Sequence, residues 1–400
     1  MNHSTNHPII PNSQEYVHEI KYVSIHSDDI DCLKYPNKSD FIIELPEDYY
    51  NIESIQLCAW TFPDNMYIFS KLQYNVTISF NINNPYNPGD FMNTDPLLNI
   101  IFVALYAHVT TDFIITIDSG NYTQSQLATE LTNRFNGIVT SYLIDYITTN
   151  SPSLLPLFNI TGYNQFVIVY NQVSQRLWFG NKSSEFILTN NSSIYDLNIT
   201  SNCINTRTLP SFSNWGLPAY LGFTRIPSTC TQSINNVLPR FYYGDVNPGD
   251  NGFWLIPDIQ YIGASVYYLE APRTLDIIGH LYFYMEIAGL NFIDETIPFN
   301  VSAFTTHTNE TNGIVNASFA KILISNILVN STWTYDEPKL KVFNPPLERL
   351  RKLKIKLRYH NGTLVDFNNN SYTFTLEMTT FRSQNTKKYK IYTPMAIEYK

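Results

Sequence analysis

The sequence predicts a mainly β protein, an antiparallel jelly-roll-like β-sandwich that carries a small inserted α+β domain. Aromatic residues make up 15% of the 400 residues, with 29 Tyr and 25 Phe, and aromatic side chains favour strands. Segments in which apolar and polar residues alternate recur towards both ends of the chain. One amphipathic helical pattern lies in the middle, and no regular alternation of strands with helices indicates a parallel sheet.

The clearest strand pattern lies near the C-terminus, between positions 352 and 359. Four basic residues alternate there with apolar ones: Lys352, Lys354, Lys356 and Arg358. A period of two places the basic side chains on one face of a strand and the apolar ones on the other. Asn361-Gly362 then supplies a tight hairpin turn, and a second alternating run covers 372–378. We predict a closing β layer with one core face and one basic face.

The N-terminal part, residues 16–110, is expected to form the first half of the sandwich. Its predicted strands are 19–24, 41–45, 52–60 and 76–82. Turns are predicted at 37–40 and 46–48 between the early strands. The continuous apolar run 100–108 fits either a buried strand or a short helix. Residues 1–15 are polar and are predicted to be a mobile arm.

Residues 111–225 are predicted to be the inserted α+β domain. Its predicted strands are 113–117, 166–170, 176–179 and 186–189, the middle two joined by a turn at 171–174. Apolar residues at helical spacing predict a helix: Leu127, Leu131, Phe135 and Ile138. Thr123 or Ser125 can cap its start, and Gly137 sits close to its expected end.

The rest of the chain returns to strands. Residues 226–252 are rich in Pro, Asn and Gly and are predicted to be a long loop. Residues 253–382 form the second part of the sandwich, with predicted strands at 265–269, 280–286, 314–323 and 339–343 before the two C-terminal ones. Residues 383–400 are predicted to be a basic tail.

The charge is unevenly distributed along the chain. The net charge of −9 argues against nucleic acid as a partner, because binding phosphates needs positive surface. Eight Lys or Arg lie between Lys339 and Arg358, so the remainder is markedly acidic. This asymmetry suits head-to-tail contact between copies or with neighbouring subunits. The alternative is a solvated strand face followed by a basic tail.

Other sequence features exclude several classes of protein. The four cysteines have no zinc-like spacing, so a reduced compartment is the simpler interpretation: Cys32, Cys58, Cys203 and Cys230. The N-terminus lacks the pattern of a signal peptide, and the longest apolar runs are too short for a transmembrane segment. Phosphate-loop, dinucleotide-binding, zinc-protease and nucleophile-elbow motifs are absent. We therefore expect neither an enzyme nor a bound cofactor or metal.

Two stretches resemble the minor capsid proteins of nucleo-cytoplasmic large DNA viruses, the giant viruses. The first covers 22–70 and contains His26-Ser27, Asp29, Ser39-Asp40-Phe41, Leu45-Pro46, Pro63 and Tyr67 where that family's opening strands have them. The second covers 345–378 and reads PPLERLRKLKIKLRYHNGTLVDFNNNSYTFTLEM. The middle segments 120–136 and 167–181 resemble a module common in the same proteins. The resemblance covers about half of the chain, in blocks.

The resemblance implies a structural component of the icosahedral capsid of a large double-stranded DNA virus. It implies a virion location, assembly in the host cytoplasm, and the major capsid protein and other minor capsid proteins as partners, with self-association as a further option. It transfers no catalytic residue. Lacking a transmembrane segment, the chain departs from family members that anchor to the inner membrane. Lys352, Lys354, Lys356 and Arg358 are the candidate subunit contact, expected to meet an acidic partner surface.

Alternatives of other classes remain open from sequence. Aromatic residues near acidic loops are compatible with a carbohydrate-binding or host-attachment β-sandwich on the virion surface: Tyr242, Trp254 and Trp333. Asp28, Asp29 and Asp31 form an acidic cluster of a kind that can hold Ca²⁺, although a polar turn after the first strand explains it more simply. A catalytic site assembled only in the tertiary structure is the residual alternative.

Overall fold

The computed structural model describes residues 16–63, 65–92, 94–193, 199–200, 206–207, 216–233, 239, 253–296, 314–324 and 340–383. The chain divides into two compact units. Unit 1 contains the described residues of 1–66, 280–298 and 312–400, and unit 2 contains those of 67–279. Unit 2 therefore interrupts unit 1 in the sequence.

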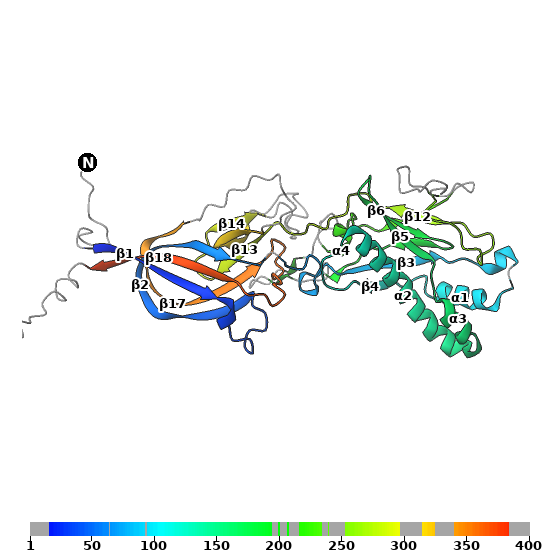
Figure 1. The fold of residues 1–400 in the computed structure, drawn as a ribbon, viewed down its shortest axis with the longest axis horizontal. Helices are drawn as coiled ribbons and strands as arrows, with labels where there is room; N and C mark the ends of the chain where they lie inside the picture. Colours follow the sequence, from blue (N-terminus) through cyan, green and yellow to red (C-terminus); the bar gives the residue numbers. More distant parts are fainter. Residues whose placement is uncertain are drawn as a thin grey trace, which may run out of the picture. The chain divides into compact units, whose positions relative to one another are not determined.

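Unit 1 is built around one curled, six-stranded antiparallel sheet (Figure 1). Its strands are β1 (Tyr16–His26), β2 (Asp40–Thr61), β13 (Tyr282–Ile287), β16 (Ala320–Leu323), β17 (Leu340–Arg358) and β18 (Thr373–Ser383). Their order in the sheet is β1-β18-β2-β17-β13-β16, so strands from the two ends of the chain alternate. A two-stranded ribbon, β14 (Ile293–Thr296) and β15 (Ile314–Ser318), completes the unit.

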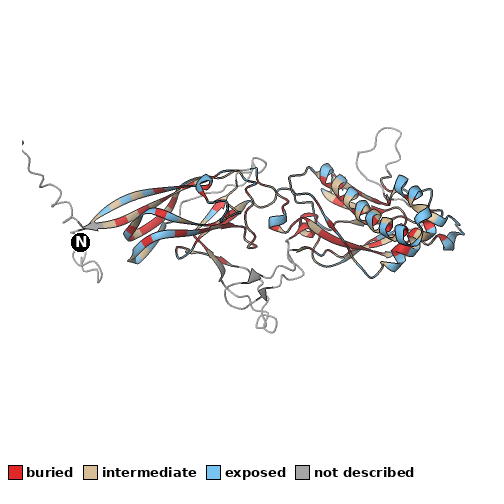
Figure 2. Ribbon diagram, turned by 90° about the horizontal axis from the view of Figure 1, so that it is seen from below, coloured by how far each residue is buried: buried red, intermediate tan, exposed pale blue. Residues whose placement is uncertain are grey.

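The core of unit 1 lies on one face of this sheet. Buried and exposed residues alternate along the strands, as Figure 2 shows. The buried face includes the apolar residues predicted at the C-terminus, among them Leu353, Ile355, Leu376 and Met378. The period of two in the sequence therefore predicted the core side of both strands correctly.

Two strands are longer than predicted. The pattern predicted a turn at 46–48, but β2 continues through it to Thr61. Likewise β17 continues from Leu340 through Pro345 and Pro346 to Arg358. The register shifts between Leu350 and Lys352, and between Val342 and Leu347, so each proline segment lies in a bulge. A bulge leaves residues outside the ladder, which tolerates the missing N–H of proline.

Unit 2 contains two four-stranded antiparallel sheets. One has the order β10 (Ser228–Thr229), β7 (Glu185–Leu188), β3 (Thr77–Asn84), β4 (Phe113–Thr116). The other has the order β11 (Thr231–Gln232), β12 (Tyr267–Glu270), β6 (Arg176–Asn181), β5 (Phe166–Asn171). The helices are α1 (Pro96–Ala107), α2 (Gln124–Asn150), α3 (Leu155–Thr161) and α4 (Leu217–Tyr220). The described residues of unit 2 also form a small pair, β8 (Ile199–Thr200) and β9 (Thr206–Arg207), and three short 3₁₀ helices: Lys71–Gln73, Pro88–Phe91 and Pro152–Leu154. A 3₁₀ helix at Ser27–Asp29 follows β1 in unit 1.

Helix α2 organises the core of unit 2. Thr123 caps it, accepting a hydrogen bond from the backbone N–H of Gln126, whose side chain bonds back to the N–H of Thr123. The helix packs against β4 from one sheet and β5 from the other. The ring of Phe135 is fully buried and stacks on Phe80 of β3, with centroids 4.3 Å apart. The helix does not end near Gly137 but runs on to Asn150, because buried apolar residues continue at helical spacing beyond the glycine.

The predicted class, a mainly β, antiparallel, sandwich-like fold, is confirmed. The predicted domain boundaries at 111 and 225 are wrong, since unit 2 begins at residue 67 and ends at residue 279. Strand β3 is an inner strand of a unit 2 sheet, and the apolar run 100–108 lies in helix α1 rather than in a strand. Residues 253–279, whose strand β12 pairs with β6, also belong to unit 2. In the predicted loop 226–252, residues 228–229 and 231–232 instead form the short strands β10 and β11. The rest of that loop at 234–238 and 240–252, the predicted arm 1–15 and the tail beyond 383 lie outside the described residues.

Replacing Phe135 by alanine is expected to destabilise unit 2 by about 3–5 kcal/mol, because it leaves a cavity beside Phe80 that the surrounding residues fill only in part. Urea unfolding followed by tryptophan fluorescence measures the change. Asn133→Ala, on the exposed side of the same helix, is the matched control and should shift the free energy of unfolding by less than about 0.5 kcal/mol. Equal effects of the two substitutions would contradict this account of the core.

Candidate interaction surfaces and a buried charge network

The predicted basic face of β17 is partly neutralised by β2. In the register of the two strands, Lys352 lies opposite Glu44, Lys354 opposite Ile42, and Lys356 opposite Asp40. Lys352 Nζ lies 2.7 Å from a carboxylate oxygen of Glu44. Within the described residues Lys354 and Lys356 make no ion pair. The surface available to an acidic partner is therefore smaller than the sequence predicted.

Arg358 is not on this surface. Its side chain is buried, with the residue only 1% exposed, although its position in the alternating pattern matches the exposed lysines. It pairs with Glu286 of β13 and Glu295 of β14. The alternation of residues along a strand predicts the face of the strand to which a side chain points. It does not predict whether another element of the structure covers that face. The prediction of Arg358 as a subunit contact is therefore corrected to a role inside the unit.

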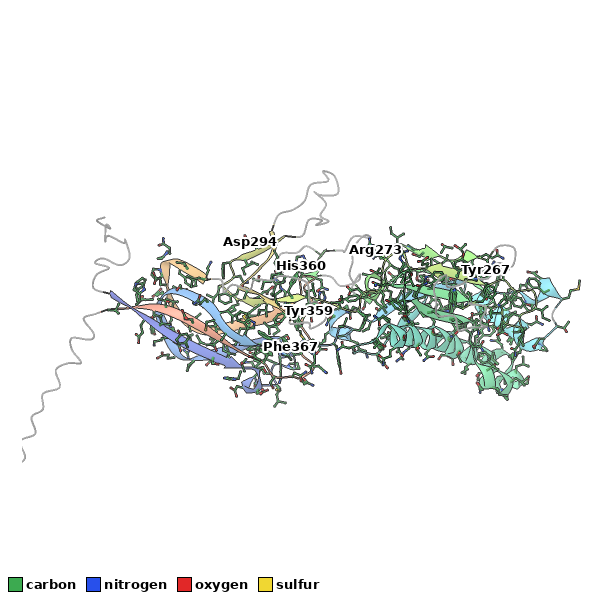
Figure 3. All side chains as sticks on the ribbon, turned by 45° about the horizontal axis from the view of Figure 1, so that its top comes forward. Tyr267, Arg273, Asp294, Tyr359, His360 and Phe367 are labelled. Atoms are coloured by element: carbon green, nitrogen blue, oxygen red, sulfur yellow. The ribbon has the colours of Figure 1, made fainter. Side chains whose placement is uncertain are left out.

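The covered arginine is part of a charge network. Arg358 Nη1 donates to Glu295 Oε1 at 3.1 Å and to the carbonyl of Tyr359 at 3.3 Å, and its guanidinium lies 5.5 Å from the ring centre of Tyr284. The same Oε1 of Glu295 lies 3.2 Å from Nδ1 of His360, which Figure 3 labels beside Tyr359. The network joins β13, β14, β17 and the turn after β17. It fastens the β14–β15 ribbon to the main sheet.

The pKa of Glu295 lies below the ordinary value for a glutamate. Burial alone raises this pKa, but the hydrogen bonds and charges of His360 and Arg358 favour the ionised form more strongly. Burial raises the pKa of the Tyr284 phenol, which keeps that group neutral. Sequence analysis missed Glu286, Glu295 and His360, and only the alternation of Glu286 with Tyr282 and Tyr284 hinted at a shared polar face.

The acidic cluster after β1 is a polar turn. Asp28 accepts a hydrogen bond from Lys38 Nζ at 3.3 Å and another from Ser371, and together these bonds hold its pKa below the ordinary value. Asp31 accepts hydrogen bonds from two backbone N–H groups of its own turn, those of Leu33 and Lys34. No group of three potential metal ligands occurs among the residues that the structure describes.

Of the three aromatic residues of the carbohydrate-binding alternative, Trp254 alone lies in the described part of the chain. Trp254 is half-buried and packs edge-on against Trp178 of β6, with ring centres 5.8 Å apart. It also covers Gly180, where an added Cβ would lie 2.8 Å from the indole. Tyr242 and Trp333 lie outside the described residues. Carbohydrate binding stays a prediction that no specific contact favours.

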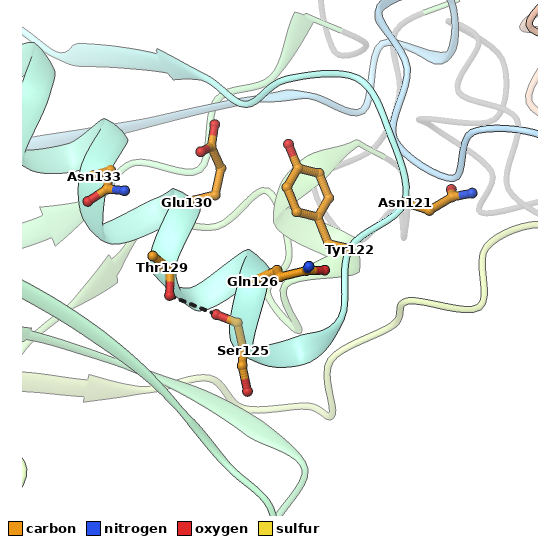
Figure 4. A pocket seen from close by; sticks show the side chains of 7 residues that line it. All are labelled: Asn121, Tyr122, Ser125, Gln126, Thr129, Glu130 and Asn133. Atoms are coloured by element: carbon orange, nitrogen blue, oxygen red, sulfur yellow. Dashed lines mark hydrogen bonds between the residues drawn. The ribbon is translucent and has the colours of Figure 1, made fainter.

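Two shallow hollows lie along α2 in unit 2. The first, of about 490 Å³, is lined by residues from the start of the helix and the two residues before its cap (Figure 4). Within it Thr129 donates a hydrogen bond to the carbonyl of Ser125. Burial, with the nearby charges of Glu130 and Asp118, raises the pKa of the Tyr122 phenol. The second hollow, of about 600 Å³, lies between α2 and β4 and shares Glu130 and Asn133 with the first. These hollows had no counterpart in the sequence analysis.

Comparisons with known proteins find distant structural similarity. No protein-family model matches the chain, and no curated protein matches it. The chain is similar to the crystal structure of the selenomethionine-labelled mavirus penton protein, with 8% sequence identity and a TM-score of 0.29. The match covers 91% of this chain and 98% of that one. Among the described residues, no helix combines the length and the apolar character needed to cross a membrane.

Acid is expected to weaken the attachment of the β14–β15 ribbon. Because the pKa of Glu295 is lower in the folded state, its stabilising contribution is complete above the ordinary glutamate pKa of about 4.3 and is lost as the pH falls through the folded-state value. Thermal unfolding between pH 7 and pH 3 should show this loss. Glu295→Gln should lower stability at pH 7 and flatten the pH dependence. Glu348→Gln, at an exposed glutamate of the same unit, should leave the profile unchanged.

Proposed function

We propose that this protein is a structural component of a viral capsid, and specifically a minor capsid protein of a large double-stranded DNA virus. One observation carries the proposal. The two sequence stretches that resemble such proteins, 22–70 and 345–378, lie in neighbouring strands of a single sheet. Segments nearly 300 residues apart therefore act as one structural module, and the resemblance has an architectural basis.

The pairing between these stretches is extensive. β1 pairs with β18 over its whole length, from Tyr16 opposite Ser383 to His26 opposite Thr373. β2 pairs with β18 on one side and with β17 on the other. The middle segments that resemble the same family, 120–136 and 167–181, supply the first half of α2 and most of the β5–β6 hairpin of unit 2. Each resembling block thus contains defined strands or helices, and the first block, 22–70, lies in unit 1 except for its last four residues.

The outer face of the unit 1 sheet supports a role in assembly. Four large apolar side chains are roughly half exposed or more on β1 and β17: Ile20 (54%), Tyr22 (63%), Leu340 (49%) and Val342 (57%). The strand registers place Tyr22 and Leu340 in one row, on either side of Glu377 and Gln56, which are hydrogen-bonded at 2.9 Å. Ile20 and Val342 flank the next row. Exposed apolar side chains gathered on one sheet face are typical of a protein interaction site.

The proposal includes a location and partners. We place the protein in the virion, assembled in the host cytoplasm, in contact with the major capsid protein and other minor capsid proteins. Mass spectrometry of gradient-purified virions tests the location directly. The protein should co-purify with the major capsid protein at constant stoichiometry through successive gradients. After protease treatment of intact particles, the fraction of it that is retained should be at least as large as the retained fraction of the major capsid protein. Its absence from washed particles would refute the proposed function.

Charge reversal tests the part of the β17 face that is not neutralised. Lys354→Glu with Lys356→Glu should lower incorporation into particles by roughly tenfold, since charge contacts of the exposed Lys354 and the partly exposed Lys356 contribute up to about 1 kcal/mol each. Incorporation is measured by quantitative mass spectrometry of particles from cells that express the variant. Lys34→Glu with Lys71→Glu changes the net charge equally at exposed positions elsewhere and serves as the control. Unchanged incorporation of the β17 variant would refute the contact while leaving the proposed function standing.

A further inference from the structure

We propose that the hollow between α2 and β4 of unit 2 binds the C-terminal segment of a second copy of this chain, residues 384–400, as an added β-strand. The proposed capsid function specifies neither this partner nor this site, and the docking proposal does not depend on that function. It rests on the open edge of β4, the shape of the hollow, and the length and charge of the segment.

Strand β4 has an open edge. It lies at the end of its sheet and pairs with β3 alone among the described residues. The N–H of Ile117 donates to the carbonyl of Val76 at 2.9 Å, towards β3. Backbone groups alternate in direction along an antiparallel strand, so Ile114 and Thr116 direct their N–H and C=O groups outward. An extended segment that adds to this edge would satisfy these groups, as in other cases of strand addition.

The hollow beside this edge is shaped to hold side chains. Its walls are Ile114, which is 62% exposed, and Thr116 on β4, and Asn133, Ile138 and Ser141 on α2. Gly137 lies between them, and a Cβ added to it would meet no atom within 4 Å. Glycine inside a helix costs about 1 kcal/mol relative to alanine. No neighbouring atom in the described part of the chain requires a glycine at this position. A side chain from another molecule that lies over Gly137 would occupy the space that the missing Cβ leaves.

The C-terminal segment has a suitable length and pattern. Strand β18 ends at Ser383, and residues 384–400 of the sequence follow it. The part of α2 that lines the hollow, from Glu130 to Ser141, is about 16 Å long at 1.5 Å per residue, which matches five strand residues at about 3.3 Å each. Residues 387–391 alternate, with Lys387, Tyr389 and Ile391 on one face. That face would lie towards α2.

The charges are complementary. The segment 384–400 contains four lysines and one glutamate. Asp118 and Glu130 share Arg134, at 2.7 and 2.6 Å, so this end of the hollow carries one excess negative charge. Asp118 follows the C-terminal end of β4. We place Lys387 at that end, Tyr389 over Gly137 and Ile391 near Ser141. With this placement the added strand runs antiparallel to β4, as the described strand pairs of unit 2 do.

Isotope-mixed crosslinking of the full chain tests the proposal. A photo-crosslinking amino acid in place of Ile114 is introduced into unlabelled protein, which is mixed with ¹⁵N-labelled wild-type protein and irradiated. Mass spectrometry should find crosslinks from position 114 of the unlabelled chain to residues 384–400 of the labelled chain. The same amino acid in place of Ile226, an exposed residue elsewhere in unit 2, should not give these crosslinks.

Substitutions at Gly137 separate docking from folding. Gly137→Trp fills the hollow and should reduce the crosslinks at least tenfold, whereas Gly137→Ala should stabilise α2 and retain them. Circular dichroism spectra like that of the wild type, together with a cooperative unfolding transition, confirm that both variants fold. The proposal would be overturned if crosslinks to 384–400 formed only within one chain, or if crosslinks formed only to other segments or not at all. Equal crosslink yields from the two Gly137 variants would also overturn it. None of these results bears on whether the protein occurs in virions.

Discussion

The interleaved pairing of the two chain ends is the constraint on which unit 1 depends. β18 lies between β1 and β2, and β17 lies on the other side of β2, so the sheet cannot form before residues more than 300 positions apart meet. Closing so long a loop costs entropy, but the cost grows only logarithmically with length. An inserted unit of some 200 residues is therefore tolerated thermodynamically, while the high sequence separation of the contacts is expected to slow folding.

The same arrangement explains where the positive charge of the C-terminal region goes. The β2–β17 ladder sets Lys352 against Glu44, and β14 brings Glu295 to the buried Arg358. A buried guanidinium is costly unless carboxylates accompany it. Within the described residues, Lys354 and Lys356 of β17 make no ion pair and remain available to partners. Assembly through this protein would use apolar strand faces and edges as much as charge.

Residue patterns predicted the elements whose packing is local. The period of two along 352–359 and 372–378 gave the correct buried faces, and the helical spacing around Leu127 gave α2 with Thr123 as its cap. The pattern did not predict that β2 passes through Pro46, because bulges depend on the partner strand. It also assigned β3 and β12 to the wrong unit, since alternation shows that a segment is a strand without showing its neighbours.

The sequence by itself determined the mainly β class, the inserted helix-containing unit, and the core faces of the C-terminal strands, because these follow from local periodicity. Only the tertiary structure decided that Arg358 is buried against two glutamates while Lys354 remains exposed, although both occupy the same face of one strand. The reason is physical. Periodicity specifies the direction of a side chain, whereas its burial, its charge partners and the hollow beside β4 depend on which distant segment packs there.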